Sequence, residues 1–266
     1  MLNNALKQKT AQAKLVIEDT FEAYPTDQCL IAWCTGKDST LLLRLILDVC
    51  LEKGFTPPPT LDIDQDDQFD ELTRFRDQLI DHWGVKLLLV RNNNFLDKLT
   101  QHGERVAVSK LDHINQQALL NINYQQDYVR WEPDSPVCNH LLKTVPINQA
   151  IEQYGIKAMF TGSRWDEHGA RGNETYFSPR SSLEHMRIHP ILHLTGRDAW
   201  EITHGMDIPH NSLYQLGYRL LGSKTGTKKP AEIQAWEQDL EGTSVRGGRN
   251  EEKVKVMAQL RTWRYM

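Results

Sequence analysis

Cysteine is scarce in this chain of 266 residues, and its placement excludes several kinds of site. The four cysteines are Cys29, Cys34, Cys50 and Cys138. None of them forms a Cys-x-x-Cys pair, and none follows residue 138. We therefore expect no disulfide framework, no zinc ribbon and no iron–sulfur cluster held by cysteines in the C-terminal part.

Long apolar runs and a large excess of one charge are also missing. No stretch approaches the roughly 18 apolar residues of a membrane-spanning helix. Residues 1–24 form an amphipathic pattern without the apolar block of a signal peptide. The formal net charge is -4, so the surface as a whole does not favour nucleic acid or membranes. We expect a cytoplasmic protein without membrane contact.

Strand and helix patterns alternate from the N-terminus onward. The hydrophobic spacing predicts helices at about 4–23, 37–53 and 66–84 and buried strands at 28–34, 56–64 and 85–92. Gly54 and Gly84 are typical residues for ending the second and third of these helices. The alternation predicts an α/β fold with a parallel-stranded, doubly wound sheet and right-handed crossovers.

The later part of the chain is less regular. Residues 93–140 are polar and rich in Asn and Gln, and we expect a helical insertion that covers part of a cleft. A helix and a strand follow, and then a strand and a helix capped near Thr195. We assign residues 1–218 to one domain. Residues 219–266, where Lys and Arg outnumber Asp and Glu, form a basic C-terminal extension that closes over the active site.

The segment IAWCTGKDST joins a predicted strand to a predicted helix. Free backbone N–H groups and the helix dipole attract anions at such a junction. Gly36 permits close approach of a ligand to the backbone, Lys37 adds a full positive charge, and Ser39 adds a hydroxyl group. A Walker A loop would need glycine at Ile31 and Ser or Thr at Asp38, and the spaced glycines of a Rossmann fingerprint are missing. The loop predicts a phosphate site of another kind.

The loop resembles the S-G-G-x-D-S pattern of the PP-loop ATP pyrophosphatases, in the form Cys34-Thr35-Gly36-Lys37-Asp38-Ser39. Further blocks resemble, in order, those of the adenine nucleotide alpha-hydrolase group, which contains PAPS reductase and, most similar of all, the small catalytic subunit of bacterial sulfate adenylyltransferase. These blocks are Ile63-Asp64-Gln65 with Phe69 and Glu71; Gly162-Ser163-Arg164-Trp165-Asp166-Glu167 with Arg171 and Glu174; Pro190, Thr195, Asp198 and Trp200; Ile208, Pro209, Leu213 and Tyr214; and Thr243-Ser244-Val245-Arg246-Gly247-Gly248-Arg249.

The resemblance implies attack on the α-phosphorus of ATP, transfer of AMP to an oxyanion acceptor and release of pyrophosphate, with ATP and Mg²⁺ as cofactors. It implies catalytic roles for Lys37, Asp38, Arg164 and Arg171. The residues it implies for ATP binding are Cys34, Thr35, Gly36, Lys37, Asp38, Ser39, Asp64 and Gly162. Pyrophosphate or the acceptor would meet Arg246 and Arg249, and magnesium would be held by Asp38 and Asp166.

The acceptor stays open at this stage. The shared blocks favour sulfate, with adenylyl sulfate as product and a GTPase subunit as partner. The departures at Cys34, Thr35 and Gln65 leave two alternatives. One is ATP activation for sulfur insertion into nucleic acid (DNA phosphorothioation or tRNA thiolation), with a cysteine desulfurase and nucleic-acid-modifying proteins as partners. The other is a regulatory subunit that binds nucleotide without turnover.

The C-terminal sequence argues against a reductase of PAPS or APS. Those reductases use a C-terminal cysteine in an E-C-G motif, and the sequence here reads LRTWRYM. Without a thiol to attack sulfur, we expect neither reductase chemistry nor an iron–sulfur cluster. Self-association into a homo-oligomer is left open.

Overall fold

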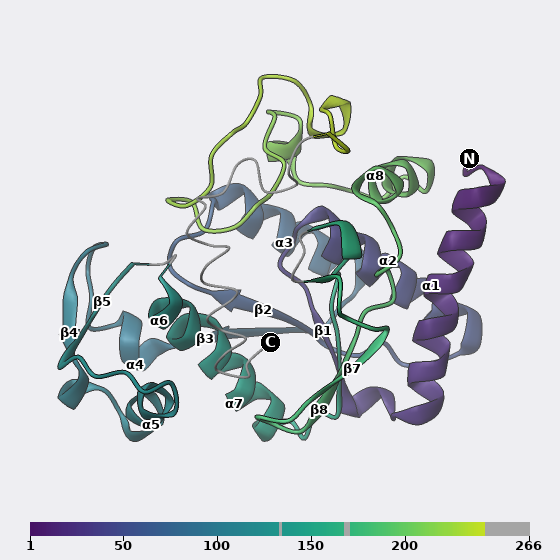
Figure 1. Cartoon of the computed structure of the whole chain (residues 1–266). Coiled ribbons are helices and arrows are strands. Elements are labelled where there is room, and N and C mark those ends of the chain that lie inside the picture. Colours follow the sequence, from purple (N-terminus) through teal and green to yellow (C-terminus); the bar gives the residue numbers. More distant parts are fainter. Residues whose placement is uncertain (133–134, 168–170, 243–266) are drawn as a thin grey trace.

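The computed structural model describes residues 1–132, 135–167 and 171–242, and Figure 1 shows a central sheet with helices on both faces. The six strands lie in the order β3-β2-β1-β6-β8-β7. Their bounds are Cys29–Ala32 (β1), Thr60–Asp64 (β2), Leu87–Arg91 (β3), Ala158–Phe160 (β6), Phe177–Arg180 (β7) and His185–Ile188 (β8). All neighbours are parallel except β7, which is antiparallel to β8. The predicted α/β class is confirmed, whereas β7 was not predicted.

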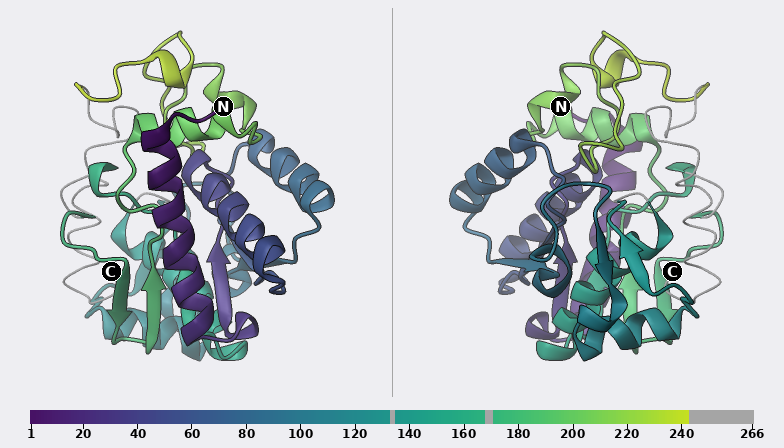
Figure 2. Two further views of the ribbon diagram at one scale, coloured as in Figure 1. Left: turned by 90° about the vertical axis from the view of Figure 1, so that its right-hand side faces the viewer. Right: turned by 90° about the vertical axis from the view of Figure 1, so that its left-hand side faces the viewer.

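Helices cover both faces of this sheet (Figure 2). Their bounds are Asn4–Ala23 (α1), Lys37–Lys53 (α2), Asp70–Trp83 (α3), Val145–Gln153 (α7) and Gly196–Gly205 (α8). Residues of α1, α2, α3 and α8 share one apolar core with Cys29 and Ile31, whereas Leu30 packs with α7 on the other face. Successive strand residues point to opposite faces, so one short strand serves both cores.

The observed helix ends lie close to those predicted from the sequence. The first three helices were predicted almost at their observed bounds, and Gly54 and Gly84 adopt φ values of 75° and 63° just after α2 and α3. Such left-handed residues end helices without the steric penalty of a side chain. At α8 the Thr195 side chain accepts from the Asp198 N–H, and the Asp198 side chain accepts from the Thr195 N–H. This capping box fixes the start of the helix.

The insertion at 93–140 contains helices, as predicted, and also a small sheet that was not predicted. It contains α4 (Asn93–Leu96), α5 (His113–Asn121) and α6 (Pro136–Asn139), together with a two-stranded antiparallel sheet of β4 (Arg105–Ala107) and β5 (Tyr128–Arg130). Each strand carries a single fully buried apolar residue, Val106 or Val129, so no alternation was visible in the sequence. The insertion shares an apolar core with Leu141, Leu142 and Val145 and projects beside β3 in Figure 1.

The described part of the C-terminal extension, residues 219–242, packs against the main domain. Leu221 and Ala235 share an apolar cluster with Phe69, Trp200 and Tyr214. Packing therefore runs across the boundary that we set at residue 218. Residues 243–266, which include Arg246 and Arg249, lie outside the described residues. No helix of the described segments is both long and apolar enough to cross a membrane.

Candidate active site

A cleft opens where the chain changes direction across the sheet. Strand β1 lies between β2 and β6, so the connections that follow β1 and β6 lead to opposite halves of the sheet. Ligands of open α/β sheets bind at such a switch point, beyond the carboxyl ends of the strands. The cleft encloses about 450 Å³, and its wall includes Cys34, Gly36, Lys37, Asp38 and Ser39. The phosphate loop predicted from the sequence therefore lines the cleft.

Thr35 gives this loop its sharp turn. Its φ is 57°, in the left-handed region that strongly disfavours a β-branched residue. The Thr35 hydroxyl donates to the carbonyl oxygen of Cys34 at 2.7 Å, and the side chain is buried. The strict PP-loop pattern has glycine at this position, and the left-handed backbone supplies a physical reason for that glycine. Cys34 Sγ lies 3.5 Å from Ser39 Oγ across the turn.

Lys37 stands at the first position of α2 and is buried. Its Nζ lies 2.6 Å from Asp38 Oδ1. Burial lowers the pKa of Lys37, and the nearby charge of Arg164 lowers it further. The Lys37 backbone N–H donates to the Tyr214 hydroxyl at 2.9 Å. Tyr214 was part of a matched sequence block, yet it was not named as a site residue.

Arg164 joins the loop after β6 to the first turn of α2. Its side chain is 1% exposed, and its guanidinium contacts the Asp38 carboxylate through Nη1 and Asp166 Oδ1 through Nε at 2.9 Å. Burial alone would raise the pKa of Asp38, but the charges of Arg164 and Lys37 lower it overall. Asp38 is thus an ionised carboxylate that holds two buried cations in place.

Asp166 is already engaged on both carboxylate oxygens. Arg164 Nε meets Oδ1, and the Gly196 N–H donates to Oδ2 at 2.6 Å. This geometry argues against Asp166 as a magnesium ligand and gives it the role of positioning Arg164. The two cations near Asp38 both meet Oδ1. Within the described segments no group of three or more His, Cys, Asp or Glu side chains could hold a metal.

Gly162 has a packing reason to be glycine. A Cβ built on Gly162 would lie 2.9 Å from both the Asp38 carbonyl carbon and the Ser39 nitrogen. These are backbone atoms of α2, so they cannot rotate away. Gly162 therefore allows the loop after β6 to lie directly against the first turn of α2, and it also lines the cleft.

Asp64 does not line the cleft, although we had assigned it to ATP binding. It is the last residue of β2 and pairs with its cross-strand neighbour Arg91, at 3.1 Å from Oδ2 to Nη1. The cleft is lined instead by the neighbours Ile63 and Gln65 and by Asp62.

Two further arginines lie in the cleft wall beyond β6. Arg171 approaches Glu167 at 3.8 Å and Glu174 at 3.9 Å, both long ion pairs. Arg187 comes from β8 and was not recognised in the sequence, because RIHPIL reads simply as a buried strand. The only sequence feature that could have drawn attention to it is a charged residue inside an apolar strand.

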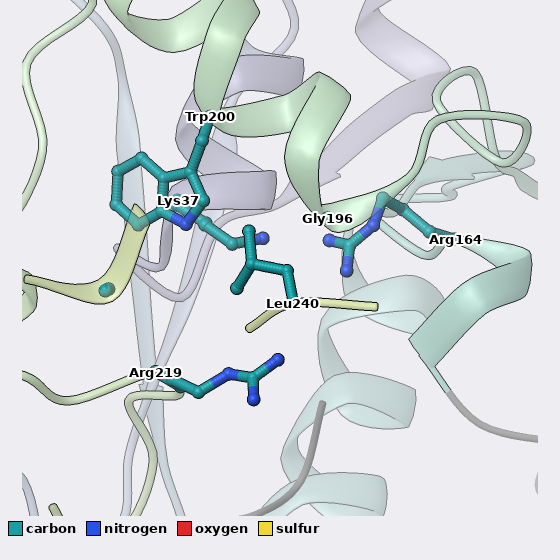
Figure 3. Close-up of a pocket in the computed structure, with 7 residues that line it drawn as sticks. Lys37, Arg164, Gly196, Trp200, Arg219 and Leu240 are labelled. Atoms are coloured by element: carbon teal, nitrogen blue, oxygen red, sulfur yellow. The ribbon is translucent and has the colours of Figure 1, made fainter. Parts of the chain in front are cut away.

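Cationic side chains also converge beside the loop itself (Figure 3). Lys37, Arg164 and Arg219 border a small cavity of about 10 Å³ together with Trp200 and Leu240. Figure 3 shows the charged ends of all three side chains directed toward the same space. Arg219 was not predicted, and its Nη1 donates to the Asp239 carbonyl at 3.2 Å. The three cations lie near one helix N-terminus, where positive charge favours an anion, and the Asp38 and Asp166 carboxylates neutralise part of that charge.

Comparison with known proteins agrees with this geometry. The family model of the phosphoadenosine phosphosulfate reductase domain matches residues 28–229, from β1 to beyond the cleft. The chain belongs to this family. The matched range contains the PP-loop, Gly162, Arg164, Arg171, Arg187 and Arg219, whereas Leu240 lies beyond it.

Curated relatives of this family member are about one quarter identical to it. A protein of Halorhodospira halophila named sulfate adenylyltransferase subunit 2 is 25% identical over 245 residues, which cover 84% of this chain and 70% of the relative. A protein of the same name from Rhizobium meliloti is 26% identical, over 83% of this chain and 71% of the relative.

Solved structures share the fold of this family member at lower identity. The FMN adenylyltransferase of Candida glabrata, in complex with FMN and the ATP analogue AMPCPP, superposes with a TM-score of 0.63 at 16% identity, covering 94% of this chain and 76% of that chain. The phosphoadenylyl-sulfate reductase of Candida auris gives a TM-score of 0.57 at 14% identity, covering 84% of this chain and 96% of that chain. These likenesses show the fold.

Proposed function

We propose that the protein is an ATP pyrophosphatase of sulfur metabolism that transfers AMP from ATP to sulfate, giving adenylyl sulfate and pyrophosphate. The observation that carries the proposal is the convergence of Lys37, Arg164 and Arg219 beside the N-terminus of α2. The names of the curated relatives support sulfate as the acceptor.

In this reaction a sulfate oxygen attacks the α-phosphorus of ATP. A new S–O–P bridge forms, the bond from the α-phosphorus to the bridging β-phosphate oxygen breaks, and pyrophosphate leaves with the electron pair. Negative charge develops on the leaving oxygen, where positioned donors stabilise the transition state most. We assign this role to Lys37, Arg164 and the backbone N–H groups in the first turn of α2. Asp38 keeps the two cations in place before ATP arrives.

Magnesium enters the proposal only as the usual companion of ATP. It prefers oxygen ligands and commonly takes one or two carboxylates together with phosphate oxygens, whose charge it neutralises. Asp38 fits that part through its Oδ2, whereas Asp166 does not. The relatives are named as a second subunit, which supports a partner subunit for this chain. The resemblance of the sequence blocks implies that this partner is a GTPase, which would drive the unfavourable transfer.

The proposal is tested with ATP and inorganic sulfate, with and without the GTPase subunit. We expect pyrophosphate release that depends on sulfate and yields adenylyl sulfate in equal amount. Pyrophosphate release that is independent of sulfate, both with and without the GTPase subunit, would contradict sulfate as the acceptor. Release that depends instead on a cysteine desulfurase and nucleic acid would favour the sulfur-insertion alternative.

Lys37→Ala tests the site within the same assay. We expect kcat/KM for ATP to fall by about 10²- to 10³-fold, the usual cost of removing one preorganised donor from a transition state. Arg74→Gln is the matched control, because Arg74 lies exposed on α3 and pairs only with Glu71 among the described residues. Wild-type rates in Lys37→Ala would contradict the assignment.

A further inference from the structure

Arg187 is a cation of the cleft wall without a matching carboxylate. Its Nε is buried and has no hydrogen-bond partner within the described segments. No described carboxylate forms an ion pair with Arg187, and the side chain borders the cleft. A buried N–H group left without a partner costs free energy, because the hydrogen bond it made to water is not replaced.

The surroundings of Arg187 add positive charge rather than removing it. Arg171 and Arg180 both act on Arg187 as repelling neighbours. Glu174 is the attracting carboxylate, but it is already engaged by Arg180 Nη2 at 3.0 and 3.1 Å and faces His189 Nε2 at 3.5 Å. Burial, together with the charges of Arg180 and Arg171, lowers the pKa of Arg187 to about 10.

This cationic corner is separate from the cavity beside the PP-loop. That cavity is bordered by Lys37, Arg164 and Arg219, whereas Arg171 and Arg187 border only the larger cleft. Thr161, at the end of β6, also lines the cleft and is held by His189, with 2.6 Å between Oγ1 and Nδ1. The phosphate loop and the arginine corner thus lie along one cleft, as a reaction of two anions requires.

We infer that Arg171 and Arg187 form the acceptor subsite, which takes a tetrahedral dianion such as sulfate beside the bound ATP. The inference rests on the proposed function and adds to it a specificity-determining residue, Arg187. Planar guanidinium groups bind the oxygens of such anions through paired hydrogen bonds. Two guanidinium groups facing one ligand favour a doubly charged anion over a singly charged one, because each charge of the ligand then meets a cation.

The inference predicts a selective defect in Arg187→Gln. We expect the KM for sulfate to rise by about tenfold or more, as for the loss of a charged hydrogen bond, while the KM for ATP stays within about twofold. Arg187→Lys keeps the positive charge but loses the planar guanidinium group. Its KM for sulfate should therefore lie between those of the wild type and Arg187→Gln. Arg74→Gln, on exposed α3, should match the wild type. An equal rise in both KM values, or an unchanged KM for sulfate, would overturn the inference.

Direct binding separates this inference from the proposed function. Calorimetry with inorganic sulfate, in the presence of a non-hydrolysable ATP analogue, should give binding to the wild type and to Arg74→Gln and at least about tenfold weaker binding to Arg187→Gln. Equal binding to all three proteins rules out the subsite even if adenylyl sulfate is formed. Binding that requires Arg187 supports the subsite even if sulfate is never adenylated. If circular dichroism shows that Arg187→Gln does not fold, sulfate binding is measured with Arg187→Lys and Arg171→Gln instead. Both should bind sulfate more weakly than the wild type and Arg74→Gln.

Discussion

A methyl group at position 162 would collide with the backbone of α2. The built Cβ lies 2.9 Å from backbone atoms of Asp38 and Ser39, and neither can move without shifting the PP-loop. We expect Gly162→Ala to lower the free energy of unfolding by about 1–3 kcal/mol, the range for overpacking. Denaturant unfolding measures the effect, and ATP affinity should fall with it because the loop is displaced.

Gly196→Ala is the matched control for that substitution. Its Cβ would lie 3.6 Å from Arg164 and Asp166, which is ordinary van der Waals contact. It also stands at the first position of α8, where alanine is tolerated. A stability loss in Gly196→Ala as large as that in Gly162→Ala would mean that the backbone clash is not the cause.

At the scale of single residues, local spacing identified the residues of the PP-loop but not the residues that reach the cleft from distant parts of the chain. Gly36, Lys37 and Asp38 are consecutive residues, so the sequence alone shows that they lie close together. Arg187 and Arg219 enter the cleft from elements far along the chain, and no local pattern marks where their side chains end. The ion pair of Asp64 was also not visible in the sequence, because its partner Arg91 belongs to the neighbouring strand.

At the scale of elements, the start of α8 depends on its capping box. Thr195→Ala removes the side-chain acceptor for the Asp198 N–H. We expect a loss of about 1 kcal/mol in the free energy of unfolding, within the usual range for a lost N-cap. Denaturant unfolding of the purified protein checks this value.

The conservative change at the same position provides the control. Thr195→Ser keeps the hydroxyl and should stay close to the wild type. Asp198 also bonds Lys9 of α1 at 2.6 Å, so the capped end of α8 is joined to the N-terminal helix. If Thr195→Ser were as unstable as Thr195→Ala, the lost methyl contact rather than the cap would explain the effect.

The helix predicted after the insertion begins in an unexpected form. Residues His140–Thr144 form a π-helix, and the Val145 N–H bonds the His140 carbonyl, before α7 continues. Pro146 has no N–H to offer the preceding turn, which favours such an irregular start. The widened turn brings Lys143 and Thr144 to the cleft. Helical periodicity alone could not predict this, because α and π turns share nearly the same apolar pattern.

At the scale of the whole molecule, buried histidines make stability depend on pH. Burial lowers the pKa of His140 and of His185 from 6.5 to about 4. The unfolded chain therefore takes up these protons near pH 6.5, while the folded protein takes them up only near pH 4. Stability is fully present above pH 6.5 and falls as the pH drops from 6.5 toward 4.

This dependence is measured by denaturant unfolding at several pH values across that window. We expect the slope of the unfolding free energy against pH to be smaller in His140→Gln than in the wild type. His113→Gln serves as the control, because His113 is exposed on α5. A His140→Gln slope equal to that of the wild type would show that other groups dominate acid unfolding.

The layered architecture could be predicted because each layer has a local pattern. Strand β1 and helix α2 carry apolar periods of their own, and the order of strands and helices favours a parallel sheet. Strand β7 could not be predicted, because an edge strand of Phe177–Arg180 has little apolar alternation and depends on pairing with β8. The two short strands of the insertion, β4 and β5, could not be predicted for the same physical reason.

The apolar core that the insertion shares with Leu141, Leu142 and Val145 is separate from the two cores of the sheet. Asn92 Nδ2 donates to Asn115 at 2.6 Å and to the Leu141 carbonyl at 2.9 Å, which joins the insertion to the π-helix. A region whose apolar core is separate from that of the sheet can open locally while the sheet stays folded. The cleft also includes Asn139 and Lys143 from this side. A ligand that contacts Asn139 and Lys143 binds only the closed form and therefore disfavours opening. Its binding should slow amide hydrogen exchange throughout the insertion, including at residues that the ligand does not touch.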